Sequence, residues 1–366
     1  MKFGTLFFSL SLLIGIMLPN NGVPTPASCG PIHNPDGTYT FSRLFVDPTG
    51  HIIDPNGCHV DLLGVNSGGA MEGAGGDVGS GGDEVLPINT VVRLAFNERW
   101  YVSNVYVPNQ GMNYQPWIAE MVSTYESRGD YVLLDADTAF FEPPCGGSIQ
   151  FCPSEDQGRL DYANPSSPYY QNPYQLEESQ GIALQALTLM AQTFSNDPAV
   201  MFDVWNEPAS YIFVIPNTEQ YRTTWMNERI NTVRQYDPLT PVFVFSIGDT
   251  ENLGYTQGNL VFDFHVYPNF SGVSPITGTS CSTTEPDWTN LAEHMSTLES
   301  AGRAVFIGEW GHCYDVPTYN TQILSVAEEY YTGMAYFAQP DLFTSKLLNQ
   351  NGQFEQSDYS TLQAQY

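Results

Sequence analysis

Two glutamates stand near the ends of two apolar segments in this 366-residue sequence. Glu207 lies in AVMFDVWNEP (199–208), and Glu309 lies in AVFIGEWGH (304–312). Apolar residues fill successive positions in both segments, which is typical of a strand buried on both faces of a parallel sheet. Parallel α/β folds carry their chemistry at the carboxyl ends of such strands. The pattern therefore predicts two carboxylates that are distant in sequence and face one substrate.

Paired carboxyl groups of this kind suit the cleavage of an acetal. One acid protonates the leaving oxygen, and in a retaining enzyme the other carboxylate, about 5–5.5 Å away, traps the oxocarbenium-like centre. Strands hold such a separation better than loops do. Taken alone, Glu207 could be a turn residue before Pro208, and Glu309 could be a strand-end carboxylate paired with an arginine. Taken together, they favour a glycoside hydrolase.

The elements around these glutamates alternate between strand and helix. Apolar positions three or four residues apart predict helices around 117–125, 184–191, 226–233, 291–298 and 323–330, whereas 249–259 shows no helical pattern. Eight strand-like segments alternate with them, which predicts a (β/α)8 TIM barrel. The strands are expected at 61–66, 90–96, 131–137, 199–205, 241–248, 260–267, 304–310 and 333–339.

The segments outside this alternation also have recognisable signals. Residues 30–60 read as a short N-terminal β-hairpin with turns at 47–50 and 55–57. The Gly-rich segment 68–84 lacks the Lys-Ser/Thr of a phosphate loop, and 138–172 is rich in Pro, Tyr and Gly. We expect both segments to be long loops on the catalytic face.

The charge of the chain limits its partners. The net charge is −29 although only 14% of residues are charged. Such a chain should repel nucleic acid and anionic membranes, which leaves neutral polymers rich in hydroxyl groups as partners. Mutual repulsion of so many carboxylates would be relieved by protonation, so we hypothesise an acidic working environment.

The N-terminus predicts secretion. Lys2, an apolar run over 6–18 and small residues up to Ala27 indicate a signal peptide over 1–27, and the run is short for a membrane anchor. Residues 28–366 then form a single catalytic domain. Six cysteines after a signal peptide favour disulfides. Proximity in sequence suggests the pairs Cys29–Cys58, Cys145–Cys152 and Cys281–Cys313, although connectivity cannot be deduced from it.

Five short motifs resemble one known family. The chain resembles glycoside hydrolase family five, the retaining cellulases and mannanases of the (β/α)8 clan, over nearly the whole mature chain. The motifs are GVN (64–66), VVRL (91–94), WNEP (205–208), HVYPN (265–269) and IGEWG (307–311). The resemblance implies that Glu207 is the general acid/base and that Glu309 is the nucleophile. Desolvation and a neighbouring carboxylate would help one of this pair to keep its proton.

The same resemblance implies supporting roles for four further residues. Asn206 would donate to the sugar 2-hydroxyl, and Arg93 would orient the nucleophile and keep it ionised. His265 would lie near the −1 sugar, and the Tyr267 hydroxyl near the nucleophile. His265 and Tyr267 are two positions apart, so their side chains share one side of the strand. The alternative for His265 is a buried structural histidine.

Two positions depart from the family pattern, and two tryptophans are platform candidates. Asp137 stands where the family usually has a histidine, and Phe337 where it has a substrate-stacking tryptophan. Phenylalanine can still stack on a sugar, with less area. Trp100 and Trp310 could form sugar platforms, because they follow the second strand and the second glutamate.

These observations lead to a secreted, extracellular, retaining endo-β-1,4-glucanase acting on cellulose-like chains. The alternatives are an endo-β-1,4-mannanase on the same site and a carbohydrate-binding protein that has lost turnover. A Ser-His-Asp esterase is disfavoured because GxSxG is missing. We expect no cofactor and no metal, no stable membrane anchor and a monomer with a polysaccharide substrate.

Overall fold

The computed structural model describes residues 29–67, 91–108, 110–136, 173–206, 218–246, 255, 257–267, 286–310, 319–330 and 332–336. The predicted signal peptide and both predicted catalytic-face loops lie outside these ranges. Glu207, Asp137 and Phe337 lie outside them as well. None of the described helices is long and apolar enough to cross a bilayer.

Eight strands close into one barrel, in the order β10-β11-β12-β13-β14-β5-β6-β9, and all neighbours are parallel. All eight predicted strands are confirmed, with bounds a few residues shorter in most cases. They are β5 (Leu63–Ser67), β6 (Val91–Phe96), β9 (Tyr131–Ala136), β10 (Val200–Asp203), β11 (Val242–Phe245), β12 (Leu260–Val266), β13 (Ala304–Trp310) and β14 (Gly333–Tyr336).

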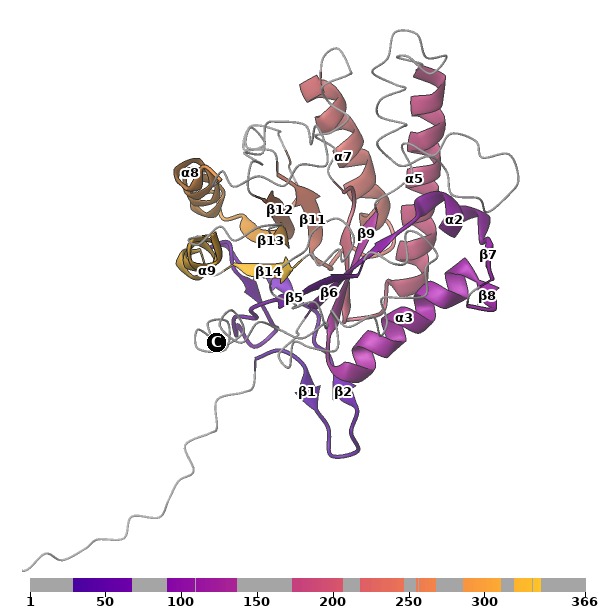
Figure 1. Ribbon diagram of the computed structural model, residues 1–366, viewed down its shortest axis with the longest axis horizontal. Helices are drawn as coiled ribbons and strands as arrows, with labels where there is room; N and C mark the ends of the chain where they lie inside the picture. The colour runs from indigo at the N-terminus through magenta and orange to yellow at the C-terminus, as the bar shows by residue number, and fades with distance from the viewer. Residues whose placement is uncertain are drawn as a thin grey trace, which may run out of the picture.

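Helices surround the barrel, as Figure 1 shows. The five predicted helical patterns fall in α3 (Tyr114–Arg128), α5 (Pro173–Phe194), α7 (Thr218–Arg234), α8 (Trp288–Ser300) and α9 (Tyr319–Glu329). A short helix that the sequence did not predict, α2 (Glu98–Ser103), follows β6, and the Asn97 side chain caps it by accepting from Trp100 N. Most of 249–259, where the sequence shows no helical pattern, lies outside the described residues.

Alternation along each strand divides the core into two layers. One layer fills the barrel interior, with Val91, Leu133, Met201, Phe243 and Phe306 among its members. The other layer lies between the strands and the helices. It is formed by the alternate residues of the same strands, whose side chains point away from the barrel interior. Both faces of every strand are therefore buried, which explains the unbroken apolar runs in the sequence.

The N-terminal segment forms two hairpins where the sequence predicted one. β1 (Ile32–His33) pairs with β2 (Tyr39–Thr40), and β3 (Phe45–Val46) pairs with β4 (Ile52–Ile53). The missed turn spans Asn34–Gly37, where Gly37 has φ 88° and its N–H donates to Asn34 O. A further small pair, β7 (Tyr106–Val107) with β8 (Met112–Asn113), precedes α3.

The second hairpin closes the amino end of the barrel. Leu44, Ile52 and Val60 belong to the same apolar cluster as the residues that fill the barrel interior. The disulfide Cys29–Cys58 ties the start of the described chain to this segment and confirms one of the predicted pairs. The other two predicted pairs lie outside the described residues.

Candidate active site

Arg93 of β6 reaches into the barrel interior and contacts side chains from five other strands or strand ends. Its guanidinium donates to Asn66 Oδ1 at 3.0 Å and to Asp203 Oδ2 at 2.8 Å. It also donates to Asn206 Oδ1 at 3.0 Å and to Glu309 Oε1 at 2.9 Å. The arginine is only 1% exposed. A buried guanidinium requires such partners, since its desolvation is costly without them.

Glu309 reaches this interior because β13 contains a bulge. Ala304 and Phe306 face the barrel interior, so strict alternation would point Gly308 inward and Glu309 outward. The pairing with β12 instead steps from Asp263↔Phe306 to His265↔Glu309, which gives β13 one extra residue. A bulge of this kind re-aims the side chains that follow it. Glu309 consequently points inward.

Three side chains hold the Glu309 carboxylate. Arg93 Nη1 binds Oε1, and the Tyr267 hydroxyl donates to Oε2 at 2.7 Å. His265 Nδ1 lies 3.4 Å from the same Oε2. Charge-assisted bonds from a guanidinium and a phenol favour the ionised form of a carboxylate. Glu309 is 7% exposed, so its carboxylate is largely desolvated.

Three buried aspartates complete the surroundings of Arg93. Asp135 Oδ2 lies 3.1 Å from Nη1, and Asp263 Oδ2 lies 3.6 Å from Nε. Burial alone would lower the pKa of Arg93, but Asp135, Asp203, Glu309 and Asp263 raise it well above its usual value. The guanidinium thus remains charged and lies between the four carboxylates.

The pKa of Asp203 is raised in this cluster. Burial raises its pKa to about 6 although Arg93 opposes the shift, and the like charge of Asp263 adds to it. Asp203 therefore holds a proton below about pH 6, which reduces the excess of negative charge around Arg93.

Asp263 holds the bulge of β13. Its Oδ1 accepts from the Gly308 N–H at 2.5 Å, and its Oδ2 lies 3.5 Å from His265 Nε2. A Cβ at position 308 would lie 2.1 Å from Asp263 Oδ2, so only glycine fits beside the carboxylate. Asp263 thus links the backbone just before Glu309 to the histidine that contacts Glu309.

The described part of the predicted site converges on one place. Asn206, His265, Tyr267 and Glu309 lie at the carboxyl ends of β10, β12 and β13, and Arg93 reaches them from the middle of β6. The Asn206 N–H donates to Ala136 O at the end of β9, which fixes the chain at the position before Glu207. Glu207, Asp137 and Phe337 lie outside the described residues, and their predicted roles stay predictions.

The two predicted sugar platforms differ in their surroundings. Trp310 is 2% exposed and packs in the layer between strands and helices, because the bulge turns it away from the barrel interior. The ring of Trp310 is therefore not exposed, whereas a tryptophan that stacks on a sugar needs an exposed ring face. Trp100 is half-buried on α2 and makes an edge contact with Tyr114, at 5.7 Å between ring centroids. Its role stays a prediction.

Sequence reasoning missed Asn66, Asp135, Asp203, Asp263 and Gly308 as parts of the site. A signal for the aspartates was present, since each interrupts an otherwise apolar strand at an inward position. A charged residue there must have a partner or a proton. Gly308 had no such signal, because the need for glycine depends on a side chain of the neighbouring strand.

This closed barrel, with carboxylates gathered at the carboxyl ends of its strands, has the architecture of a (β/α)8 hydrolase. The cellulase model of glycosyl hydrolase family 5 matches residues 88–340, and the chain belongs to that family. It is therefore a glycoside hydrolase. No curated protein matches the chain.

Several solved structures share the fold at low identity. The β-glucanase SdGluc5_26A from Saccharophagus degradans is 14% identical, with TM-score 0.60 over 94% of this chain and 99% of that one. Thermotoga maritima Cel5A, solved with mannotriose, is 17% identical, with TM-score 0.56 over 83% and 97%. Endo-glycoceramidase II from Rhodococcus sp. is 16% identical, with TM-score 0.53 over 87% and 80%. The names of these similar structures refer to different substrates.

Proposed function

We propose that this glycoside hydrolase is a retaining endo-β-1,4-glucanase with Glu309 as nucleophile and Glu207 as general acid/base. The observation that carries the proposal is the carboxylate of Glu309, which is bound by Arg93 and Tyr267 at the mouth of a closed barrel. A nucleophilic carboxylate must be ionised and held in one orientation, and these two donors serve both needs.

The reaction proceeds by double displacement. Glu309 attacks the anomeric carbon while Glu207 protonates the leaving oxygen, which gives a glycosyl-enzyme. Water, deprotonated by Glu207, then releases the sugar with retained configuration. Asn206 is held by Arg93 through its carbonyl oxygen, so the amino end of the same amide is the donor that we assign to the sugar 2-hydroxyl.

A neutral β-glucan is the substrate that the chain favours. The net charge of −29 opposes anionic polymers. A similar structure is described as a β-glucanase, which supports a glucan. The second candidate is an endo-β-1,4-mannanase, because another similar structure was solved with mannotriose. A binding protein without turnover is the remaining alternative.

Secretion is part of the same proposal. The predicted signal peptide over 1–27 and the disulfide Cys29–Cys58 support an oxidising, extracellular location. Secretion is tested by expressing the full chain in a secreting host and sequencing the N-terminus of the protein in the medium. A mature protein that begins near residue 28 is expected, and an intact Met1 would contradict the prediction.

The activity is tested with a panel of carboxymethylcellulose, mixed-linkage β-glucan and mannan, by measuring reducing-sugar release. We expect release from the glucans, and loss of at least about a thousandfold in Glu309→Gln and Glu207→Gln. Glu328→Gln, on the exposed face of α9, is the matched control and should retain full activity. Release from mannan alone would favour the mannanase, and release from none would favour the binding protein.

The role of Glu309 is tested separately. A 2-deoxy-2-fluoro-β-cellobioside with a good leaving group should inactivate the enzyme and leave one glycosyl group on the peptide that contains Glu309. Peptide mass spectrometry locates the label. A label on another carboxylate would refute the assignment. For a mannanase the corresponding mannoside should label the same residue.

A further inference from the structure

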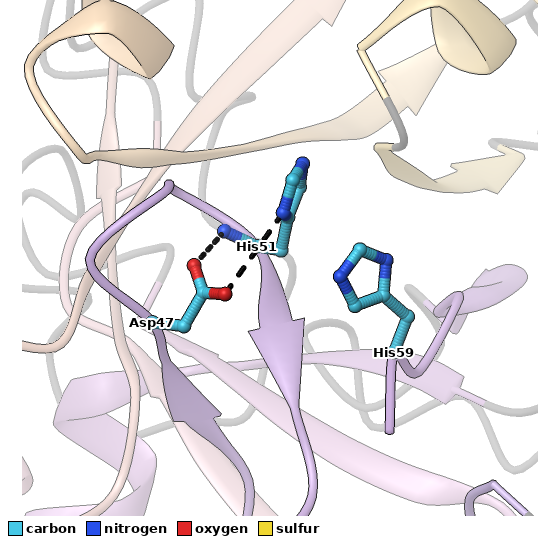
Figure 2. A group of neighbouring side chains, drawn as sticks. All are labelled: Asp47, His51 and His59. Carbon is cyan, nitrogen blue, oxygen red and sulfur yellow. Dashed lines mark hydrogen bonds and ion pairs between the residues drawn. The ribbon is translucent and has the colours of Figure 1, made fainter. Parts of the chain in front are cut away.

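A second cluster of polar side chains lies at the amino end of the barrel. Asp47 and His51 flank the turn between β3 and β4, and His59 follows on the returning segment. Figure 2 shows the three side chains gathered around one space. One ligand atom from each lies within 4.8 Å of the others. We propose that these three residues bind a divalent first-row transition metal ion, with Zn²⁺ as the best fit.

The donor set selects the class of metal. Two imidazoles and one carboxylate suit Zn²⁺ and its transition-metal neighbours, whereas Ca²⁺ and Mg²⁺ require oxygen ligands. Bond lengths of about 2.0–2.2 Å require donor atoms roughly 3.3–3.5 Å apart. Asp47 Oδ2 and His51 Nδ1 are 4.0 Å apart, and the rings of His51 and His59 are 4.4 Å apart at their centroids. Small side-chain rotations close these distances.

The backbone around the cluster fixes the orientation of the carboxylate. Asp47 Oδ1 accepts from the N–H groups of Thr49 and His51, at 2.8 and 3.0 Å. This directs Oδ2 toward the His51 ring, as Figure 2 shows. The Thr49 hydroxyl lies 2.9 Å from Asp47 Oδ2 and 2.9 Å from His51 Nδ1, and a metal ion bound to these two atoms would displace it.

His59 is fixed from the other side of the cluster. Its neighbour Cys58 is tied to Cys29 by the disulfide, and Ile53 forms a bridge with His59 itself. The imidazole is exposed, so metal can enter from solvent. Three ligands whose backbones are held in place lose little freedom on binding, and water can take the fourth position.

A carboxylate behind His51 is the second observation that points to a metal. Glu299 of α8 has Oε1 at 3.6 Å from His51 Nε2. Metal-binding histidines commonly present the other ring nitrogen to a carboxylate, which fixes the tautomer and raises the basicity of the ligand. Nδ1 of His51 therefore faces the proposed ion while Nε2 faces Glu299.

The site is structural, because it lies at the end of β13 opposite to Glu309. A Cβ at Gly50 would be 2.7 Å from Arg303 O, so the turn of the hairpin packs directly against the start of β13. An ion held by the hairpin and its returning segment would stabilise the closure of the barrel. Hydrolysis itself would proceed without it.

The proposal is tested on untagged, chelator-treated protein by titrating Zn²⁺ in a calorimeter. We expect one saturable site, an affinity at least tenfold lower in His59→Ala, and a rise in Tm of about 2–4 °C at saturating Zn²⁺ that His59→Ala lacks. His33→Ala, a histidine of the first hairpin outside the cluster, is the matched control and should bind as the unchanged protein does. Circular dichroism checks that each variant is folded.

A second measurement identifies the ligands directly. Cu²⁺ used as a probe should give an electron paramagnetic resonance spectrum with coupling to two nitrogens, and to one nitrogen in His59→Ala. The proposal is overturned if Zn²⁺ does not bind, or if His59→Ala binds it as tightly as His33→Ala. An equal loss of Zn²⁺ affinity in His59→Ala and His33→Ala would place the site elsewhere and would also overturn the proposal. Hydrolysis by metal-free protein should be unchanged in His59→Ala.

Discussion

The hydroxyl of Tyr267 allows the role of Glu309 to be tested without disturbing the packing. Tyr267→Phe removes one donor to Glu309 Oε2 and leaves the ring in place. A hydrogen bond to a charged group is worth about 1.5–3 kcal/mol, and each 1.36 kcal/mol is tenfold in rate. We expect negative charge to leave the Glu309 carboxylate only late in the reaction, so that the transition state still requires this hydrogen bond. Its loss should then lower kcat/KM by about 10- to 150-fold.

The same loss changes the pH dependence. The phenol donor favours the ionised form of Glu309, so its removal makes protonation easier and moves the acid limb of kcat/KM to higher pH. The energy above corresponds to a shift of up to about 1–2 pH units. A merely structural role would lower stability without moving this limb.

The assay measures kcat/KM between pH 3 and 8 on an aryl β-cellobioside, with urea unfolding as a check on stability. Tyr236→Phe, which alters an exposed tyrosine after α7, is the control. The reasoning is refuted if Tyr267→Phe keeps both the rate and the acid limb of the unchanged enzyme. A fall in rate that tracks a fall in unfolding free energy would also refute it.

Three further predictions concern the buried charges. Gly308→Ala crowds the Asp263 carboxylate and should lower the free energy of unfolding in urea by about 3–6 kcal/mol, because of overpacking and a lost charged hydrogen bond. Gly181→Ala on α5, where an added Cβ meets no atom within 4 Å, is the control and should not destabilise the fold. Equal effects of the two substitutions would contradict this prediction. Arg93→Met leaves four carboxylates without their cation and should cost about 3–5 kcal/mol of unfolding free energy, so a change under about 1 kcal/mol would refute the pairing. Burial and Asp197 raise the pKa of Glu126 to about 8, so the native state binds the proton more tightly than the unfolded chain and stability falls as pH rises from about 4.5 to 8. Glu126→Gln should therefore unfold at higher urea than the unchanged protein at pH 8 and at similar urea at pH 5, and parallel pH profiles would contradict this.

The sequence alone determined the alternation of strands and helices. Apolar runs fill each strand because both of its faces are buried, and the helical patterns repeat along one face because only that face meets the barrel. Local signals of this kind do not depend on distant partners. The pairing of Arg93 with a carboxylate was also predictable, because a cation within an apolar strand requires one.

The sequence also contained signals that its pattern did not resolve. The Asn34–Gly37 turn has the residues of a turn, yet hairpin boundaries depend on which strands pair. Asp203 and Asp263 were visible as charges in apolar strands, but their shared partner lies on a third strand. The distance between such groups is set by barrel closure and has no local signal.

Only the tertiary structure decided which way the residues around Glu309 point. Alternation along β13 predicts the opposite face for Glu309 and for Trp310, and the bulge opposite Asp263 and His265 exchanges them. The cluster of Asp47, His51 and His59 arises in the same way, from turns and a disulfide that bring separated positions together. Register between strands is fixed by long-range pairing, which composition and periodicity do not record.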